Sequence, residues 1–197
     1  AAKSHRIVDM RECHILRPEL FALVEPLRKQ LSTLLQPKRT AEIQLTLVDQ
    51  GIDMLIKGID AEGLEAIEQL TPFAAKNRLA RLSIDQSLGP ETLYEPQRVS
   101  VTLTGVPVAF PVGSFLQATE DGEIALVEAV LSAVDGAERA ADLFAGLGTF
   151  ALAARAFYAA EASRDAAAAL KQAAPNMTVE HRDLYRRPLD VGELKTF

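Results

Sequence analysis

The sequence predicts an α/β protein, in which an N-terminal α+β domain with an antiparallel sheet precedes part of a Rossmann-like domain. Apolar and polar residues alternate in the first half, which is typical of antiparallel strands. In the second half apolar strands alternate with helices, which is typical of βαβ units. A Gly-x-Gly loop at 146–148 joins one of those strands to its helix. We therefore expect two domains, residues 1–106 and residues 107–197.

The first half begins with a helical pattern over 18–36, where leucines recur on one stripe after Pro18. Pro26 is expected to bend or split this helix, because proline lacks an amide hydrogen and its ring clashes with the preceding turn. Residues 42–48 and 52–58 alternate on either side of a short turn and predict a hairpin. A helix over 62–75 and strands over 79–85, 91–96 and 98–104 follow.

The second half opens with a loop and a long amphipathic helix, for which Thr119 is the expected N-cap. Strands over 140–144, 157–161 and 177–183 then alternate with helices over 149–156 and 165–174. Parallel strands in this order place a ligand at their carboxyl ends. Three such strands alone leave an apolar sheet edge exposed, so we expect the chain to be a fragment of a longer protein.

The composition restricts the class of protein. A net charge of −6 argues against a surface coated for nucleic acid, although local basic clusters leave open an RNA groove as well as ordinary solvated faces. Those clusters are Arg28–Lys29, Lys38–Arg39, Lys76–Arg78 with Arg81, and Arg186–Arg187. No apolar run approaches ~20 residues, so we expect no membrane span. The single cysteine, Cys13, fits a reducing compartment, and we expect a cytoplasmic monomer.

The glycine loop suits either of two ligands. Gly146 and Gly148 allow close backbone approach to a dinucleotide pyrophosphate, as in NAD-binding proteins. Asp142, at the end of the preceding strand, would repel a diphosphate but would attract an ammonium group such as that of a methionine moiety. Glu161 closes the next strand, where an acid could accept both ribose hydroxyls, and Asp183 follows the third strand, where it could meet an adenine amino group. S-adenosylmethionine presents all three features.

Simpler interpretations of the same acids stay open. Asp142 could stabilise the positive end of the following helix, and Asp183 could be a surface turn residue. Glu161 also suits a nicotinamide cofactor, because an acidic ribose ligand ends the second strand of NAD-binding folds. An NAD(P)- or flavin-dependent oxidoreductase using the GxGxxA loop is therefore the first alternative. The second alternative is a non-catalytic RNA-binding protein that has a methyltransferase fold.

Four segments together resemble the RNA (uracil-5-)-methyltransferase family. DLFAGLGTFAL (142–152) is similar to its S-adenosylmethionine loop, and GSFLQ (113–117) is similar to its G-x-F-x-Q segment. RIVDMRECHIL (6–16) resembles the iron–sulfur stretch of the 23S ribosomal RNA branch, and RDLYRRPL (182–189) also fits. The resemblance implies a class I S-adenosylmethionine-dependent enzyme that forms 5-methyluridine, in ribosomal rather than transfer RNA. It also implies that the first domain faces the RNA.

Carried over by position, the resemblance assigns five residues to the cofactor site: Gln117, Phe144, Thr149, Glu161 and Asp183. Together with Asp142, Gly146 and Gly148 they form the predicted cofactor site, and Gln117 is also a candidate contact for the target base. Two departures from the family pattern stand out. Thr149 occupies a position where family members often carry asparagine, and the span from Phe150 to Glu161 is a few residues shorter than theirs.

The resemblance also implies where the chemistry lies. In this family a cysteine thiolate adds to C6 of uracil, which makes C5 nucleophilic, and a base later removes the C5 proton. That cysteine follows a DPPR-type motif after the third parallel strand, so we expect it and the base beyond Phe197, no catalytic residue in this chain, and no activity from it alone. Cys13 is either an inert thiol or, in the intact protein, the last of four 4Fe–4S ligands.

Overall fold

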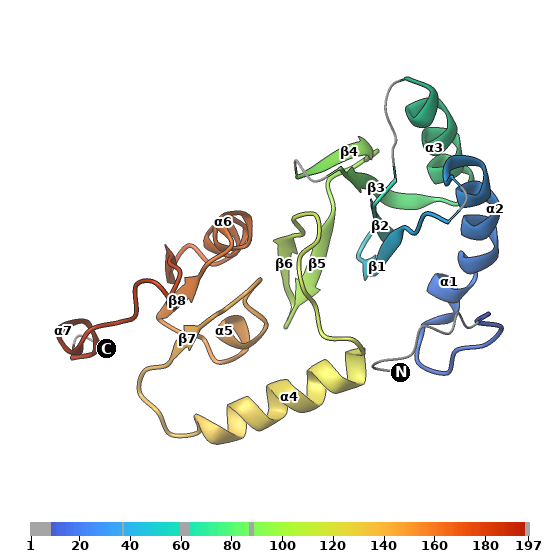
Figure 1. The fold of residues 1–197 in the computed structure, drawn as a ribbon. Coiled ribbons are helices and arrows are strands. Elements are labelled where there is room, and N and C mark those ends of the chain that lie inside the picture. The colour runs from blue at the N-terminus through green and yellow to red at the C-terminus, as the bar shows by residue number, and fades with distance from the viewer. Residues whose placement is uncertain (1–8, 37, 60–63, 87–88, 196–197) are drawn as a thin grey trace.

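The structure, a computed structural model, describes residues 9–36, 38–59, 64–86 and 89–195 (Figure 1). The first elements are α1 (Pro18–Phe21), α2 (Val24–Leu34), β1 (Glu42–Val48), β2 (Gly51–Lys57), α3 (Leu64–Lys76), β3 (Leu79–Asp85) and β4 (Pro90–Tyr94). The hairpin β5 (Ser100–Leu103) and β6 (Val106–Ala109) follows. The last are α4 (Glu120–Ala133), β7 (Ala141–Leu143), α5 (Thr149–Ala153), β8 (Tyr158–Glu161), α6 (Arg164–Ala173), β9 (Thr178–His181) and α7 (Val191–Leu194).

The first sheet has the order β1-β2-β3-β4 and is largely antiparallel. The predicted hairpin is confirmed, with Val48 paired to Gly51 across a two-residue turn. One pair differs from the expectation, because β2 and β3 run parallel. The helix α3 lies between β2 and β3 in the sequence and brings the chain back to the end of the sheet where β2 began. The strand β3 therefore runs in the same direction as β2.

The expected break in the first helix is confirmed. Ala22 and Leu23 separate α1 from α2, and Pro26 is the third residue of α2, where a missing amide is tolerated. Both helices and α3 cover one face of the sheet (Figure 1). The core on that face contains Leu20, Leu23, Leu27, Met54, Ile56, Leu70, Leu82 and Ile84.

The hairpin of β5 and β6 links the two halves of the chain. Its turn, Thr104–Gly105, has φ of +47° and +85°, as a two-residue hairpin with positive φ at both positions requires. The sequence did not predict β6, and the domain boundary that we expected after residue 106 falls inside this strand, where Val106 pairs with Leu103. The signal was present, since Val106 and Val108 continue the alternation of β5.

Contacts on both sides hold the hairpin in place. Asp49, in the turn of the first hairpin, accepts hydrogen bonds from Ser100 Oγ (2.9 Å) and Thr102 N (3.0 Å) of β5. On the other side α6 packs against β6. One buried cluster therefore runs from the first sheet to α6 and contains Val48, Ala80, Val101, Val108, Phe110, Leu147, Ala166 and Ala169.

The third sheet is parallel, with the order β7-β8-β9, as the alternation of strands and helices predicted. Thr119 caps α4 as expected, its Oγ1 accepting a hydrogen bond from Gly122 N at 3.2 Å. The helix α5 is shorter than predicted and ends at Ala153. Apolar side chains are exposed on α4 and β7, namely Ile124, Leu126, Leu131 and Leu143.

A buried ion pair ties the first sheet to the segment that leads into the second half. Arg81 and Asp53 face each other across β3 and β2, are 5% and 3% exposed, and join through Arg81 Nε and Asp53 Oδ1 at 2.7 Å. Arg81 Nη1 also donates to the carbonyl oxygen of Phe110 at 2.9 Å. This single guanidinium thus holds two strands and the chain after β6.

We predict that Arg81→Met destabilises the chain by about 3–5 kcal/mol, because it leaves the Asp53 carboxylate buried without its counter-charge. The double variant Asp53→Leu/Arg81→Met should recover most of that loss. Urea unfolding measures both, with Lys29→Met as a control, since Lys29 forms an exposed pair with Glu25 and should cost less than about 1 kcal/mol. A double variant as unstable as Arg81→Met alone would contradict this account.

Candidate functional site

The carboxyl ends of the three parallel strands bring the predicted acids to one edge. Asp142 lies within β7, Glu161 ends β8, and Asp183 comes two residues after β9. Because β8 lies between β7 and β9, Glu161 occupies the middle of this edge. In open parallel sheets this edge is where ligands bind.

The two glycines of the loop have different roles. Gly148 has φ of +94°, and a Cβ there would lie 2.4 Å from Leu170 Cδ1, so only glycine allows α6 to pack this closely. Gly146 has φ of +56°, and a Cβ there would meet nothing within 4 Å. The backbone at Gly146 therefore faces open space, where a ligand can approach it.

Asp142 carries an unusual carboxylate. Its Oδ2 is buried and has no hydrogen-bond partner among the described residues. Burial raises the pKa of this carboxyl above its usual value, and the nearby charge of Glu161 raises it too, while the amide of Ala151 acts in the opposite direction. A buried acceptor without a partner is rare in folded proteins, and it marks a place suited to a cationic or hydrogen-bond-donating ligand.

Glu161 ties the glycine loop to β8. Its Oε2 accepts from Gly146 N at 2.8 Å and its Oε1 accepts from Ser163 N at 2.6 Å. Each carboxylate oxygen has a second lone pair, so Glu161 retains capacity to accept two hydroxyl groups. The structure thus gives this residue a loop-fixing role that the sequence did not indicate.

Asp183 lies in a local turn. Its Oδ1 accepts from Tyr185 N at 3.0 Å and from Arg186 N at 3.3 Å, and Arg186 Nε lies 3.4 Å from Oδ2. Asp183 therefore begins this turn and accepts hydrogen bonds from it. Its contact with an adenine group stays a prediction.

The GSFLQ segment joins β6 to α4 and packs between the two halves. Gly113 lies against Leu55 of β2, and Leu116 packs on the cluster that includes Leu147 of the glycine loop. Gln117 is half-buried just before the N-cap of α4, and Thr149 is the half-buried first residue of α5. The placement of Leu116 brings this segment beside the loop, whereas the ligand contacts of Gln117 and Thr149 stay predictions.

Phe144 and Tyr185 form an aromatic contact at this edge. Their ring centroids are 5.3 Å apart and their planes are tilted by 48°. Phe144 has φ of +69°, which is strained for a residue with a side chain, and its ring is exposed. Sequence reasoning missed Tyr185, although an aromatic residue two positions after a predicted ligand-contacting acid was a usable signal.

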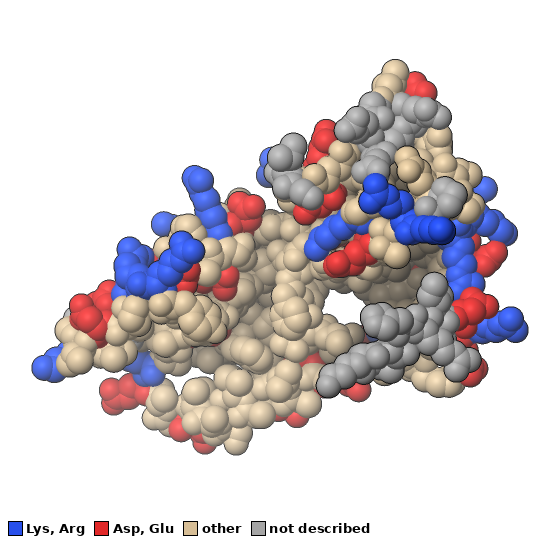
Figure 2. Space-filling model, in the orientation of Figure 1, with Lys and Arg blue, Asp and Glu red and all other residues tan. Residues whose placement is uncertain are grey.

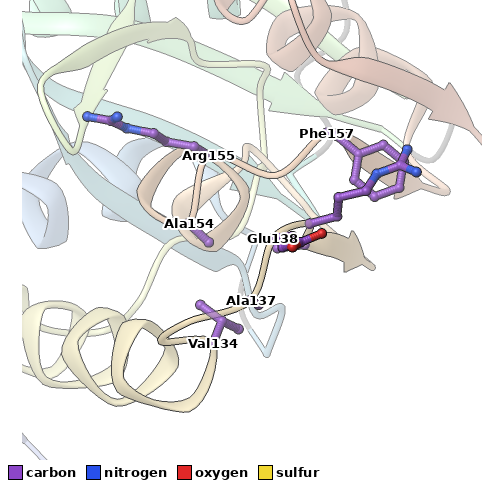
Figure 3. Close-up of a pocket in the computed structure, with 8 residues that line it drawn as sticks. Val134, Ala137, Glu138, Ala154, Arg155 and Phe157 are labelled. Carbon is purple, nitrogen blue, oxygen red and sulfur yellow. The ribbon is translucent and has the colours of Figure 1, made fainter.

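A cavity of about 260 Å³ lies at the opposite edge of the same sheet (Figure 3). Its lining includes Glu138, Arg139, Arg155 and Phe157, and the guanidinium of Arg139 lies 3.9 Å from the Phe157 ring centroid. These residues precede β7 and β8 or follow α5. None of the predicted cofactor residues lines this cavity, so we do not assign the cofactor to it.

Cys13 lies in the segment before α1, which Figure 1 shows on the far side of the molecule from β7. Its Sγ accepts from Leu16 N at 3.4 Å, and the amides of Leu16 and Ile15 lower the pKa of the thiol. Within the described ranges no group of three or more His, Cys, Asp or Glu side chains is arranged to hold a metal ion. The helices in the described ranges are also too short or too polar to cross a membrane.

Comparison with known proteins identifies the family. A protein of Zymomonas mobilis named an RNA methyltransferase is 52% identical over 201 residues, covering 98% of this chain and 51% of that protein. A Brucella melitensis protein of the same designation is 35% identical over 201 residues, covering 98% of this chain and 48% of that protein. The chain belongs to this RNA methyltransferase family. It spans about half the length of the curated relatives it matches, and no family model matches it.

Two further proteins are similar at lower identity. The 23S rRNA (uracil(1939)-C(5))-methyltransferase of Photorhabdus laumondii is 28% identical over 152 residues, covering 76% of this chain and 35% of that protein. The Pyrococcus abyssi tRNA (uracil-54, C5)-methyltransferase, solved with S-adenosyl-L-homocysteine, has a TM-score of 0.59 at 17% identity and covers 89% of this chain and 48% of that one. The structural likeness confirms the predicted fold class, a Rossmann-like class I methyltransferase domain preceded by an α+β part.

We predict that Gly148→Ala destabilises the chain by about 2–4 kcal/mol, because it combines a left-handed backbone with overpacking against the buried Leu170. Gly146→Ala is the matched control and should cost only about 1–2 kcal/mol, from the backbone alone. Equal losses in urea unfolding for the two variants would show that contact with Leu170 does not matter.

The raised pKa of Asp142 predicts a pH-dependent stability. A folded-state pKa above the usual 3.8 means that ionisation of Asp142 costs stability as the pH rises through the folded value. Asp142→Asn should therefore have a higher Tm than the wild type at pH 7, and the difference should vanish below about pH 4. Asp135→Asn, an exposed position after α4, should show no such trend, and a constant difference for Asp142→Asn across pH would exclude burial of the charge as its cause.

Proposed function

We propose that this chain is the methyl-donor-binding part of an S-adenosylmethionine-dependent RNA methyltransferase that forms 5-methyluridine, with 23S rRNA as substrate. The observation that carries the proposal is the buried, unpaired Oδ2 of Asp142 beside a glycine loop that is open to a ligand. The family named RNA methyltransferase, to which the chain belongs, supports it.

The donor set at this edge fits S-adenosylmethionine. Asp142 would hold the ammonium group of the methionine moiety, since attraction between opposite charges is strong where water is excluded. Glu161 would accept the ribose hydroxyls and Asp183 the adenine amino group, as the resemblance implies. When bound, the cofactor supplies a methyl group on a positively charged sulfur. The residues of this chain would bind and orient it, and Gln117 would contact the target base, as the resemblance implies.

The same acids disfavour the oxidoreductase alternative. Asp142 and Glu161 both lie at the glycine loop, so a diphosphate bound there would be repelled by two carboxylates. Among the described contacts of Gly146, none is with a Lys or Arg side chain that could balance this charge. The relatives supply a second argument, because they are named as methyltransferases.

The proposal also names the methylated atom, C5 of uracil, and the substrate, ribosomal RNA. The Photorhabdus laumondii relative is named for C5 of a uracil in 23S rRNA and the Pyrococcus abyssi neighbour for C5 of a uracil in tRNA, whereas an M. jannaschii neighbour with a TM-score of 0.53 is named for m1G37 of tRNA. The rRNA enzyme is the one with the sequence match, which favours ribosomal RNA. Figure 2 shows lysine and arginine side chains, interspersed with aspartate and glutamate, in two clusters toward the ends of one face, one toward the first sheet and one toward the third, with a largely uncharged middle. A structured RNA lying across this face would meet both clusters, and its target uridine would be flipped out to reach the site.

Cys13 is not the nucleophile in this proposal, because its segment lies apart from the glycine loop. We propose instead that Cys13 contributes one ligand to a 4Fe–4S cluster in the intact protein. A cluster with four cysteine ligands needs three more than this chain contains. Because the catalytic cysteine and the base are not expected among these 197 residues, the proposal is tested by cofactor binding and not by turnover.

We predict that the chain binds S-adenosylhomocysteine, and that Asp142→Asn and Glu161→Gln each weaken binding by about tenfold or more. Each loses a charge-assisted hydrogen bond worth about 1.5–3 kcal/mol. Isothermal titration calorimetry measures the affinities, with Asp135→Asn as the exposed control that should bind like the wild type. Tight binding of NADH without any response to S-adenosylhomocysteine would overturn the proposal in favour of an oxidoreductase.

A further inference from the structure

Tyr185 is a large aromatic side chain that the structure holds in solvent. It is 89% exposed, whereas Tyr158 is 6% exposed and donates its hydroxyl to Glu180. The only ring contact that Tyr185 makes among the described residues is with Phe144, which is itself 54% exposed. An exposed pair of aromatic rings at a ligand-binding edge calls for a partner with a flat apolar face.

The backbone that carries Tyr185 is rigidly anchored. Arg182 is 5% exposed and donates to the carbonyl oxygens of Arg187 and Pro188, both at 2.7 Å, and to Glu193 Oε2 at 2.9 Å. The bond from Arg182 lowers the pKa of Glu193 to about 2, so this anchor persists through the neutral and mildly acidic range. The turn at Asp183 fixes the amide of Tyr185 directly.

The aromatic contact crosses the middle of the site. Phe144 follows β7 and Tyr185 follows β9, and β8 lies between these two strands. The two rings therefore meet across the end of β8, where Glu161 stands. At 5.3 Å between centroids the rings leave no space for a third ring between them, so a planar ligand that enters between Phe144 and Tyr185 has to displace one ring from the other.

We propose that Tyr185 stacks on the adenine ring of the methyl donor, exchanging its contact with Phe144 for the nucleobase. This inference rests on the proposed function and deepens it. Adenine is favoured over the target uracil because Asp183, an acceptor for an exocyclic amino group, is two residues away in the same anchored turn. Tyr185 is thereby a binding residue for the base end of the cofactor, as Asp142 is for its methionine end.

The roles of Tyr185 at the base end of the cofactor and of Asp142 at its methionine end can be distinguished with two probes, S-adenosylhomocysteine and adenosine. Tyr185→Leu should weaken binding of both probes by about tenfold, the usual effect of losing one aromatic ring stacked on a base. Tyr185→Phe should restore binding, because it keeps the ring. Asp142→Asn should weaken S-adenosylhomocysteine but leave adenosine unchanged, because adenosine has no ammonium group. Leu194→Ala is the control for an exposed apolar residue in the same C-terminal segment.

A second readout follows ring stacking directly. The chain has no tryptophan and three tyrosines, so its fluorescence on excitation near the tyrosine band reports on tyrosine alone. Adding S-adenosylhomocysteine should quench the wild type, and most of that quenching should be lost in Tyr185→Leu while its Tm stays unchanged. If the wild type binds the probe but Tyr185→Leu binds and quenches equally, the role of Tyr185 is wrong and the proposed function stands. If the wild type binds neither probe, the proposed function itself fails.

Discussion

The contact between Gly148 and Leu170 is the constraint on which the rest of the site depends. Leu170 is fully buried, and it reaches the loop after β7 only because residue 148 has no Cβ and adopts a positive φ. That contact seats α6 against the loop, and α6 in turn packs on the β5–β6 hairpin. The helix α6 thus joins the parallel sheet to the hairpin, and the hydrogen bonds of Asp49 join the hairpin to the first sheet. The position of the glycine loop relative to Glu161 and Asp183 follows from the contact between Gly148 and Leu170.

Unfavourable features concentrate beside that contact. Asp142 keeps a buried carboxylate oxygen without a partner, and Phe144 keeps a left-handed backbone with an exposed ring. Each lowers the stability of the folded chain, and packing of the surrounding cores has to offset both. Local departures of this kind are expected where a protein binds a ligand, since the ligand supplies the missing charge or ring contact. The same loop therefore combines a closely packed glycine with groups that a cofactor could satisfy.

Sequence patterns predicted the parallel half well and the first half less completely. Strands and helices that alternate, with Asp142, Glu161 and Asp183 at strand ends, indicate one shared edge, because parallel strands align their carboxyl ends. The strand β6 was missed because Pro107 and the short Thr104–Gly105 turn resemble the end of a domain. The parallel pairing of β2 with β3 was missed because alternation along a strand does not show the direction of its neighbour.

The sequence by itself determined the fold class, the glycine loop and the chemical type of each acid, because these depend on local backbone preference and on charge. Only the tertiary structure decided what each group faces. It left Oδ2 of Asp142 without a partner, joined Glu161 to Gly146, and set the ring of Tyr185 against Phe144. These contacts connect residues that are far apart in the chain, up to 41 positions for the aromatic pair (185 − 144). Packing of whole strands and helices fixes such distances, and no pattern within one segment contains them.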